Sequence, residues 1–154
     1  MLIEHRGIIA ERTEDVPDHE WGALVIAKDC HMNCAGCFNQ HLKQSKVIKQ
    51  AAEEIVDIIC SNPLHDWLVL GGLEWTENIP GMLALVDAAQ QRNLKVIIYT
   101  GCTPKQFAAR LDTSLPRLKG CYVKYGSYDE TRKAPDLQSY NVRMASMNQF
   151  ITIL

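Results

Sequence analysis

Four short, nearly continuous apolar runs stand out along the chain. Strands that are covered on both faces have this pattern, whereas strands with one wet face alternate apolar and polar residues. The sequence therefore predicts four buried strands, at residues 21–28, 67–70, 94–99 and 120–124. A fifth apolar run, at residues 150–154, is predicted to form a terminal edge strand.

The segments between these runs have the apolar period of amphipathic helices. Residues 45–60 and 79–92 each place apolar side chains at helical spacing, which predicts two helices packed on a neighbouring layer. A third helix is predicted from Thr103 to about residue 111. Thr103 is a favourable N-cap residue, and Pro104 suits the first helical position.

Short strands that alternate with longer helices predict βαβ units and a parallel sheet. A closed eight-fold barrel typically takes about 250 residues, and this chain has 154. The predicted fold class is therefore α/β, with an open sheet or a partial (open) parallel β/α barrel. We expect residues 1–154 to form one domain, because the sequence contains no linker, repeat or low-complexity tract.

Charge and hydropathy exclude several classes of partner. Sixteen Lys and Arg against eighteen Asp and Glu give a net charge of -2, without the basic excess that binding to nucleic acid needs. Charged residues stand within the first six positions, and no apolar run has the length of a signal peptide or a membrane span. We therefore expect a cytoplasmic protein without a membrane or nucleic-acid partner.

The six cysteines are numerous for a chain of this length. Disulfides are rare in a reducing cytosol, so these residues are expected to be core side chains, ligands or nucleophiles. Cys30, Cys34 and Cys37 have the spacing C-x3-C-x2-C on the polar loop that follows the first strand. Three thiolates on one loop can bind three irons of a cubane cluster, which leaves the fourth iron open to a small molecule.

Other interpretations of the cysteines stay open at this point. Zinc could use the same three thiols with His31 or His41 as a fourth ligand, or the three could be buried cysteines clustered by chance. Cys60 and Cys121 are predicted to be core residues, whereas Cys102 is either a core residue or part of the site. The remaining histidines lack ligand spacing and are expected at the surface or at caps: His5, His19 and His65.

A glycine pair follows the second predicted strand. Gly71 and Gly72 would let a ligand approach the backbone closely, and Glu74 could accept a hydrogen bond from an ammonium group. The simpler alternative is an ordinary strand-to-helix turn. Thr100 and Lys124 stand at the ends of two later strands, so they would lie at the same edge of a parallel sheet.

The cysteine spacing resembles the signature of the radical S-adenosylmethionine superfamily. Residues 34–39, Cys-Ala-Gly-Cys-Phe-Asn, are similar to the C-P-G-C-[YF]-N form in activating proteins of anaerobic ribonucleoside-triphosphate reductase. Residues 124–128 and 146–149 resemble the late glycine turn and the S-x-N-Q ending of those proteins. The resemblance covers residues 21–149, and the cysteine motif is its most specific part.

This resemblance implies a radical-SAM-type partial barrel, a [4Fe-4S] cluster and S-adenosyl-L-methionine as cofactors. Cys30, Cys34 and Cys37 would be the catalytic cluster ligands. The implied cofactor-binding residues are Gly36, Cys37, Phe38, Gly71, Gly72, Glu74, Thr100 and Lys124. The sequence departs from the superfamily's Gly-Gly-acid-Pro pattern, because Leu73 precedes Glu74 and Trp75 replaces the proline.

The implied activity is reductive cleavage of S-adenosylmethionine to make a glycyl radical on the large subunit of anaerobic ribonucleoside-triphosphate reductase. A low-potential donor such as flavodoxin or ferredoxin would supply the electron. One alternative is an activase of another glycyl-radical enzyme, or a small-molecule enzyme similar to the deazapurine synthases. An alternative from another class is a zinc- or cluster-binding interaction module without catalysis.

Overall fold

Seven strands form one mixed sheet in the computed structural model, which describes residues 1–37 and 39–154. The strand order is β3-β1-β2-β4-β5-β6-β9, so β3 and β9 are the two edges of an open sheet. Its strands are β1 (Leu2–Arg12), β2 (Gly22–Ala27), β3 (Ile48–Ala51), β4 (Trp67–Gly71), β5 (Lys95–Tyr99), β6 (Tyr122–Tyr125) and β9 (Phe150–Ile153). Two further short strands, β7 (Gln138–Ser139) and β8 (Val142–Arg143), pair with each other.

The centre of the sheet is parallel, as the sequence predicts. β2, β4, β5 and β6 pair in that order, and Leu68 lies between Ala23 on one side and Val96 on the other. Every residue of β2 and of β4 is buried, which explains why both appear in the sequence as unbroken apolar runs. Because the strands are parallel, their carboxyl ends all reach one edge of the sheet.

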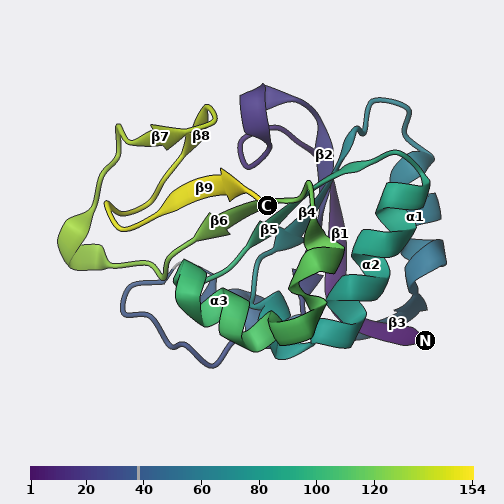
Figure 1. Cartoon of the computed structure of the whole chain (residues 1–154), viewed down its shortest axis with the longest axis horizontal. Helices are drawn as coiled ribbons and strands as arrows, with labels where there is room; N and C mark the ends of the chain where they lie inside the picture. The colour runs from purple at the N-terminus through teal and green to yellow at the C-terminus, as the bar shows by residue number, and fades with distance from the viewer. Residues whose placement is uncertain (38) are drawn as a thin grey trace.

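Three α-helices connect these strands: α1 (Ala52–Cys60), α2 (Ile79–Gln91) and α3 (Pro104–Leu111). Figure 1 shows them gathered on one side of the molecule, with the β7–β8 hairpin on the other. α3 begins where the sequence predicts, with a capping box formed by Thr103 and Gln106. At the start of α2 the Asn78 side chain accepts a hydrogen bond from Gly81 N.

Strands β1 and β3 extend the sheet with antiparallel pairing. β1 is absent from the sequence prediction and pairs antiparallel with both β2 and β3. Positive φ angles at Gly7 (130°) and Glu11 (58°) accompany register shifts in β1 and break the alternation that would reveal a strand. The predicted sheet is therefore confirmed for its four parallel strands and is extended by antiparallel ones.

The predicted helix at residues 45–60 starts too early. Ile48–Ala51 is strand β3, which pairs with the beginning of β1, and helix α1 begins only at Ala52. The apolar positions before Ala52 continue the helical period by coincidence, and pairing with a distant strand decides their conformation. The C-terminal prediction is confirmed, since β9 is an edge strand that pairs antiparallel with β6.

Two of the three scattered histidines are buried: His5 contradicts the expected surface or cap position, whereas His65 contacts a carbonyl in the last turn of α1, as a capping group does. His5 is fully buried, accepts a hydrogen bond from Gly7 N at Nδ1 (3.0 Å) and contacts Gln50 Oε1 through Nε2 (2.8 Å). His65 Nε2 accepts from Glu11 N (2.9 Å), while its Nδ1 lies 2.9 Å from the Ile59 carbonyl. Both rings satisfy backbone or side-chain groups inside the fold, and His19 is exposed as expected.

The core cysteines agree with the prediction. Cys121 is buried, and Cys60 is partly buried and packs against the core. Cys102 is also fully buried. Across residues 1–37 and 39–154, the helices are too short or too polar to cross a membrane.

Candidate functional site

The loops that follow the parallel strands meet at one edge of the sheet. β2 leads into the cysteine loop, defined here as residues 30–37, and β4 leads into residues 71–74. β5 is followed by Thr100 and Gly101, and β6 is followed by Gly126. Ligands of open α/β sheets bind at this edge, which makes it the candidate site.

A cavity of about 760 Å³ opens beside these loops. Its wall contains most of the residues that the sequence predicts for the site: Cys30, Cys34, Cys37, Gly71, Gly72, Glu74, Thr100 and Lys124. These residues come from four segments that are distant in the chain. Gly36 is exposed and is absent from the described wall, whereas Phe38 lies outside the described residues.

The cavity has further walls that the sequence reasoning missed. Gly126, Ser127 and Gln149 line it from the C-terminal part of the chain. Arg12 lines it from the end of β1, and Asp15 from the connection between β1 and β2. The first group belongs to the segments 124–128 and 146–149, which resemble family motifs, but that resemblance does not predict that these residues line the cavity. Nothing in the local sequence marks the second group, because β1 itself has an irregular pattern.

The cysteine loop carries three free, partly buried thiols. Cys37 N donates to the Cys34 carbonyl (3.1 Å), which closes a tight turn with Gly36 at φ +71°. Burial raises the pKa of Cys30, partly offset by a hydrogen bond from the Met32 backbone, and the negative charges of Glu74 and Glu77 raise it further. Without a bound cation, Cys30 is therefore held as the neutral thiol.

The donor set of the loop fits a cubane iron-sulfur cluster, since thiolates are the protein ligands of such clusters. All three thiols line the same cavity, and none is engaged in a disulfide. Among the described side chains, no group of three or more His, Cys, Asp or Glu residues is gathered closely enough to hold a metal ion. The chemistry of the three residues therefore fits the group and all three line one cavity, but their thiols are not gathered at one point.

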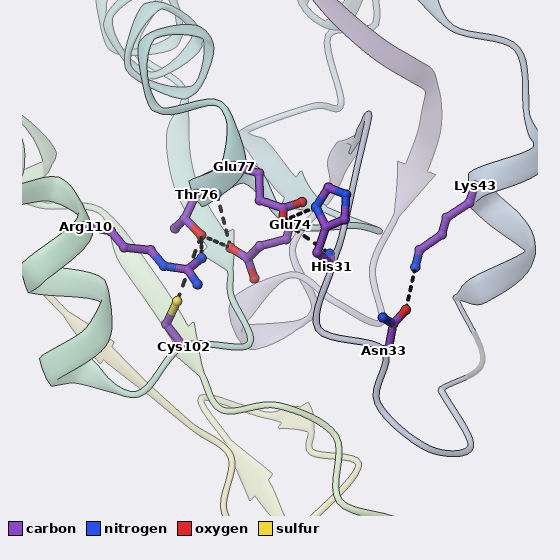
Figure 2. Close-up of polar contacts among 8 residues, drawn as sticks. All are labelled: His31, Asn33, Lys43, Glu74, Thr76, Glu77, Cys102 and Arg110. Atoms are coloured by element: carbon purple, nitrogen blue, oxygen red, sulfur yellow. Dashed lines mark hydrogen bonds and ion pairs between the residues drawn. The ribbon is translucent and has the colours of Figure 1, made fainter.

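Contacts with other elements fix the position of the cysteine loop. His31 contacts Glu77 Oε1 through both its backbone N (3.2 Å) and its ring Nδ1 (2.6 Å), as Figure 2 shows. His31 thus pairs with the 3-10 turn Trp75–Glu77, and its ring is exposed. On the opposite side, Met32 packs so closely on Gly101 that a Cβ there would overlap the Met32 sulfur.

The glycine pair adopts a backbone that other residues tolerate poorly. Gly72 has φ +76°, and a Cβ at this position would lie 2.9 Å from Cγ2 of Ile26 on β2. Gly71 is the last residue of β4 and lies against the Tyr99 side chain on β5. The pair therefore lets the chain turn sharply away from the sheet while staying close to both neighbouring strands.

Glu74 is a buried carboxylate with most of its oxygen sites occupied. Its side chain accepts hydrogen bonds from Gly101 N (2.7 Å), from Thr100 Oγ1 (3.0 Å) and from both the N (3.1 Å) and Oγ1 (2.6 Å) of Thr76. Its backbone N donates to the Asp29 carbonyl (2.9 Å). Glu74 therefore joins the ends of β4 and β5 and ties both to the start of the cysteine loop.

A second ring of contacts surrounds this carboxylate. Arg110 of α3 donates to Thr76 Oγ1 (2.6 Å), and Cys102 Sγ lies 3.9 Å from the same hydroxyl (Figure 2). Cys102 is fully buried behind Glu74 and is not part of the described cavity wall. Its placement therefore supports the interpretation as a core residue.

Lys124 is one of the cationic side chains that line the cavity. Its ammonium lies 5.4 Å from the centre of the Tyr99 ring and 3.5 Å from the Gly126 carbonyl. Burial lowers the pKa of Lys124 to about 8, while the negative groups Glu74, Cys34 and Cys37 act in the opposite direction. The cavity thus combines a lysine, a carboxylate and three thiols within one wall.

Comparison with known proteins gives one match. A family model described as a 4Fe-4S single cluster domain matches residues 22–151, which include the cysteine loop and every strand from β2 to β8. The searches of curated proteins and of solved structures return no match.

Proposed function

The chain belongs to the 4Fe-4S single cluster domain family, and we propose that Cys30, Cys34 and Cys37 are the ligands of its cluster. The observation that carries this proposal is the placement of all three free thiols on the wall of one cavity at the carboxyl edge of the sheet. Three protein ligands leave one iron open to a small molecule.

We further propose that this small molecule is S-adenosyl-L-methionine and that the protein is a radical SAM activase. When bound, the cluster would supply one electron for reductive cleavage of the sulfonium to methionine and a 5′-deoxyadenosyl radical. A low-potential donor such as flavodoxin or ferredoxin would restore that electron. The cavity of about 760 Å³ is of the size that binds small molecules, and its wall is mainly apolar with a few polar and charged groups, as in many ligand sites.

The remaining wall residues would bind and orient the cofactor. Lys124 is the group best suited to pair with the cofactor carboxylate, because its ammonium lies inside the cavity without an ion-pair partner among the described residues. Gly71 and Gly72 would allow the cofactor to approach the backbone. Glu74 could receive the cofactor ammonium only in place of one of the four donors that now bond to its oxygens, which come from Thr76, Thr100 and Gly101.

The proposed macromolecular substrate is the large subunit of anaerobic ribonucleoside-triphosphate reductase, on which the radical would abstract hydrogen from a glycine. Support comes from the resemblance of residues 34–39 and 146–149 to the activating proteins of that enzyme. The rival is an activase of another glycyl-radical enzyme or a small-molecule enzyme similar to the deazapurine synthases. The substrate that consumes the radical discriminates these functions.

Anaerobic reconstitution with iron and sulfide tests the cluster site. We expect a [4Fe-4S] cluster that cleaves S-adenosylmethionine on reduction, and we expect each of Cys30→Ala, Cys34→Ala and Cys37→Ala to abolish cleavage. Cys60→Ala and Cys121→Ala are the matched controls and should keep it. Stoichiometric zinc without cleavage would overturn the activase, and equal loss in a folded Cys60→Ala protein would overturn the ligand assignment.

Co-purification with the candidate large subunit tests the partner. After incubation with reductant and S-adenosylmethionine, electron paramagnetic resonance should detect a glycyl radical on that subunit. A protein that cleaves the cofactor but leaves no such radical would belong to one of the rival functions.

A further inference from the structure

The C-terminal Ser-x-Asn-Gln motif lies next to the turn that follows β6. Gln149 Nε2 donates to the Gly126 carbonyl (3.1 Å), and Asn148 Nδ2 donates to the Ser127 carbonyl (2.7 Å). Ser146 Oγ accepts from Asp129 N (3.2 Å). Three side chains of one short segment, Ser146, Asn148 and Gln149, thus bond to three residues of the turn 126–129, and we call these three side chains the polar clamp.

Hydrogen bonds within the segment 145–149 stabilise the polar clamp. Gln149 Oε1 accepts hydrogen bonds from Ala145 N (2.9 Å) and Ser146 N (3.2 Å), and Ser146 Oγ donates to Asn148 Oδ1 (2.6 Å). Ser146 is fully buried and Gln149 nearly so. A buried polar network in which each member is bonded is rigid, because any displacement leaves a donor or acceptor unpaired.

Close contacts at Gly126 restrict the conformation of the turn that the clamp holds. Gly126 has φ +105°, and a Cβ there would lie 2.8 Å from the Asn148 carbonyl. The backbone N of Gly126 also donates a hydrogen bond to the Cys102 carbonyl (2.9 Å), which connects the turn to the loop that follows β5. The clamp and the turn therefore behave as one unit.

The far end of this turn contacts the cysteine loop. A Cβ at Gly36 would overlap the Glu130 carboxylate and would lie 3.5 Å from the Tyr128 ring. Gly36 stands between two of the three cysteines, at the turn closed by Cys37 N and the Cys34 carbonyl. Gly126, Ser127, Tyr128 and Gln149 also line the cavity together with the thiols.

We propose that Asn148 and Gln149 are positioning residues for the cysteine loop: by holding the turn 126–129 they press Tyr128 and Glu130 against Gly36 and keep Cys34 and Cys37 enclosed. Neither residue contacts a thiol, so both act through the turn. The effect on a bound cluster rests on the proposed function, whereas the effect on the thiols does not.

Two isosteric variants test the proposal. Asn148→Asp and Gln149→Glu each keep the oxygen that accepts hydrogen bonds within the clamp and remove the amide donor to the turn. Gln138→Glu makes the same change at an exposed position of β7 and is the matched control. Glu130→Ala removes an exposed side chain at the far end of the turn, where folding is not at risk.

The first readout uses the cluster-free protein under reducing conditions. Alkylation by iodoacetamide, followed by mass spectrometry of each cysteine peptide, should be several-fold faster at Cys34 and Cys37 in Asn148→Asp, Gln149→Glu and Glu130→Ala. The rate at Cys60 should not change, since a general loosening of the fold would raise it too. Unchanged rates at Cys34 and Cys37 in all three variants would overturn the proposal.

The second readout uses the reconstituted protein. Loss of the visible cluster absorbance to an iron chelator should be about 10-fold faster in both isosteric variants, the lower end of the effect that outer-shell changes have on metal sites. Gln138→Glu should match the parent. If the parent protein binds no cluster, the proposed function is refuted, and the alkylation rates alone then decide the positioning role. If both isosteric variants retain the cluster as the parent does, the proposed effect on the cluster is refuted.

Discussion

At the scale of single residues, the cavity depends on two charged side chains with opposite environments. Glu74 is nearly fully buried and accepts hydrogen bonds from Thr76, Thr100 and Gly101. Lys124 lies in the same wall with a weak contact to a carbonyl and an aromatic ring. Glu74 therefore connects the ends of β4 and β5 and is also a candidate cofactor-binding residue, whereas Lys124 is available to pair with an anionic group.

Replacement of Glu74 by glutamine should show the structural part of its role. One oxygen becomes an amide NH₂, which cannot accept the hydrogen bonds of Gly101 N or Thr76 N and leaves a buried donor unpaired. We expect Glu74→Gln to lower the free energy of unfolding by about 1–3 kcal/mol, measured by urea denaturation. Glu77→Gln, which affects a solvent-exposed contact to His31, should cost less than about 1 kcal/mol. Equal stabilities of the two variants would contradict this account.

The lowered pKa of Lys124 predicts a pH dependence of stability. In the folded cluster-free protein the pKa is about 8, against an ordinary 10.5. Between pH 8 and pH 10.5 this lysine is more protonated in the unfolded chain than in the folded protein, so the free energy of unfolding rises with pH. Below about pH 8 the lysine is charged in both states, and burial of its charge lowers the free energy of unfolding by a constant amount. Lys124→Met should therefore be stabilised relative to the parent at pH 7, with the difference shrinking by about 3 kcal/mol as the pH approaches 10.5.

Urea denaturation of both proteins from pH 7 to pH 10 measures this difference and cancels the titration of the other groups. A difference that stays constant across the range would show that the ammonium of Lys124 is not desolvated in the folded protein.

At the scale of elements, the site depends on how each strand ends. β4 ends at Gly71, and Gly72 then turns the chain across Ile26 of β2 in a left-handed conformation. The turn after β6 uses Gly126 in the same way, against the polar clamp. Glycine is needed at these places because a side chain would separate the loops that together form the cavity.

Two alanine substitutions separate backbone strain from crowding. Gly120 has φ +86° with open space around it, whereas Gly72 has φ +76° and would place a Cβ 2.9 Å from Ile26. Both Gly120→Ala and Gly72→Ala should lose about 1–2 kcal/mol for the left-handed backbone. Gly72→Ala should lose about 1–3 kcal/mol more through overpacking. Thermal denaturation measures both, and a Gly72→Ala protein as stable as Gly120→Ala would show that the Ile26 side chain can move aside without cost.

At the scale of the whole molecule, segments from both halves of the chain complete the sheet. β1 and β3 extend one side of the parallel strands, and β9 extends the other. The cavity likewise takes Arg12 from the first part of the chain and Gln149 from the last. Such interleaving favours the proposal that residues 1–154 form one cooperative unit.

Urea denaturation followed by two probes tests this proposal. Far-ultraviolet circular dichroism reports the helices and strands, and tryptophan fluorescence reports the three tryptophans, of which Trp67 and Trp75 are buried near opposite ends of β4 and Trp21 is exposed. We expect the two transition curves to coincide in one step. Separate midpoints would mean that part of the sheet unfolds independently.

The parallel strands, the three helices and the cysteine motif could be predicted because each depends on local information. Burial on both faces makes β2 and β4 apolar throughout, and Thr103 with Pro104 encodes the start of α3 in adjacent residues. The spacing of Cys30, Cys34 and Cys37 predicts iron-sulfur chemistry, which agrees with the family of the chain.

Only the tertiary structure decided the rest, because it depends on pairing between distant segments. Residues 48–51 have the period of a helix, yet they form β3 because β1 offers them a partner. Glu74 bonds to the end of β5 instead of facing only a ligand, and Gln149 reaches a turn that lies more than twenty residues earlier. The sequence by itself determined the parallel strands and the loop on which the three candidate thiols lie, while long-range contacts decided which other side chains line the cavity beside them.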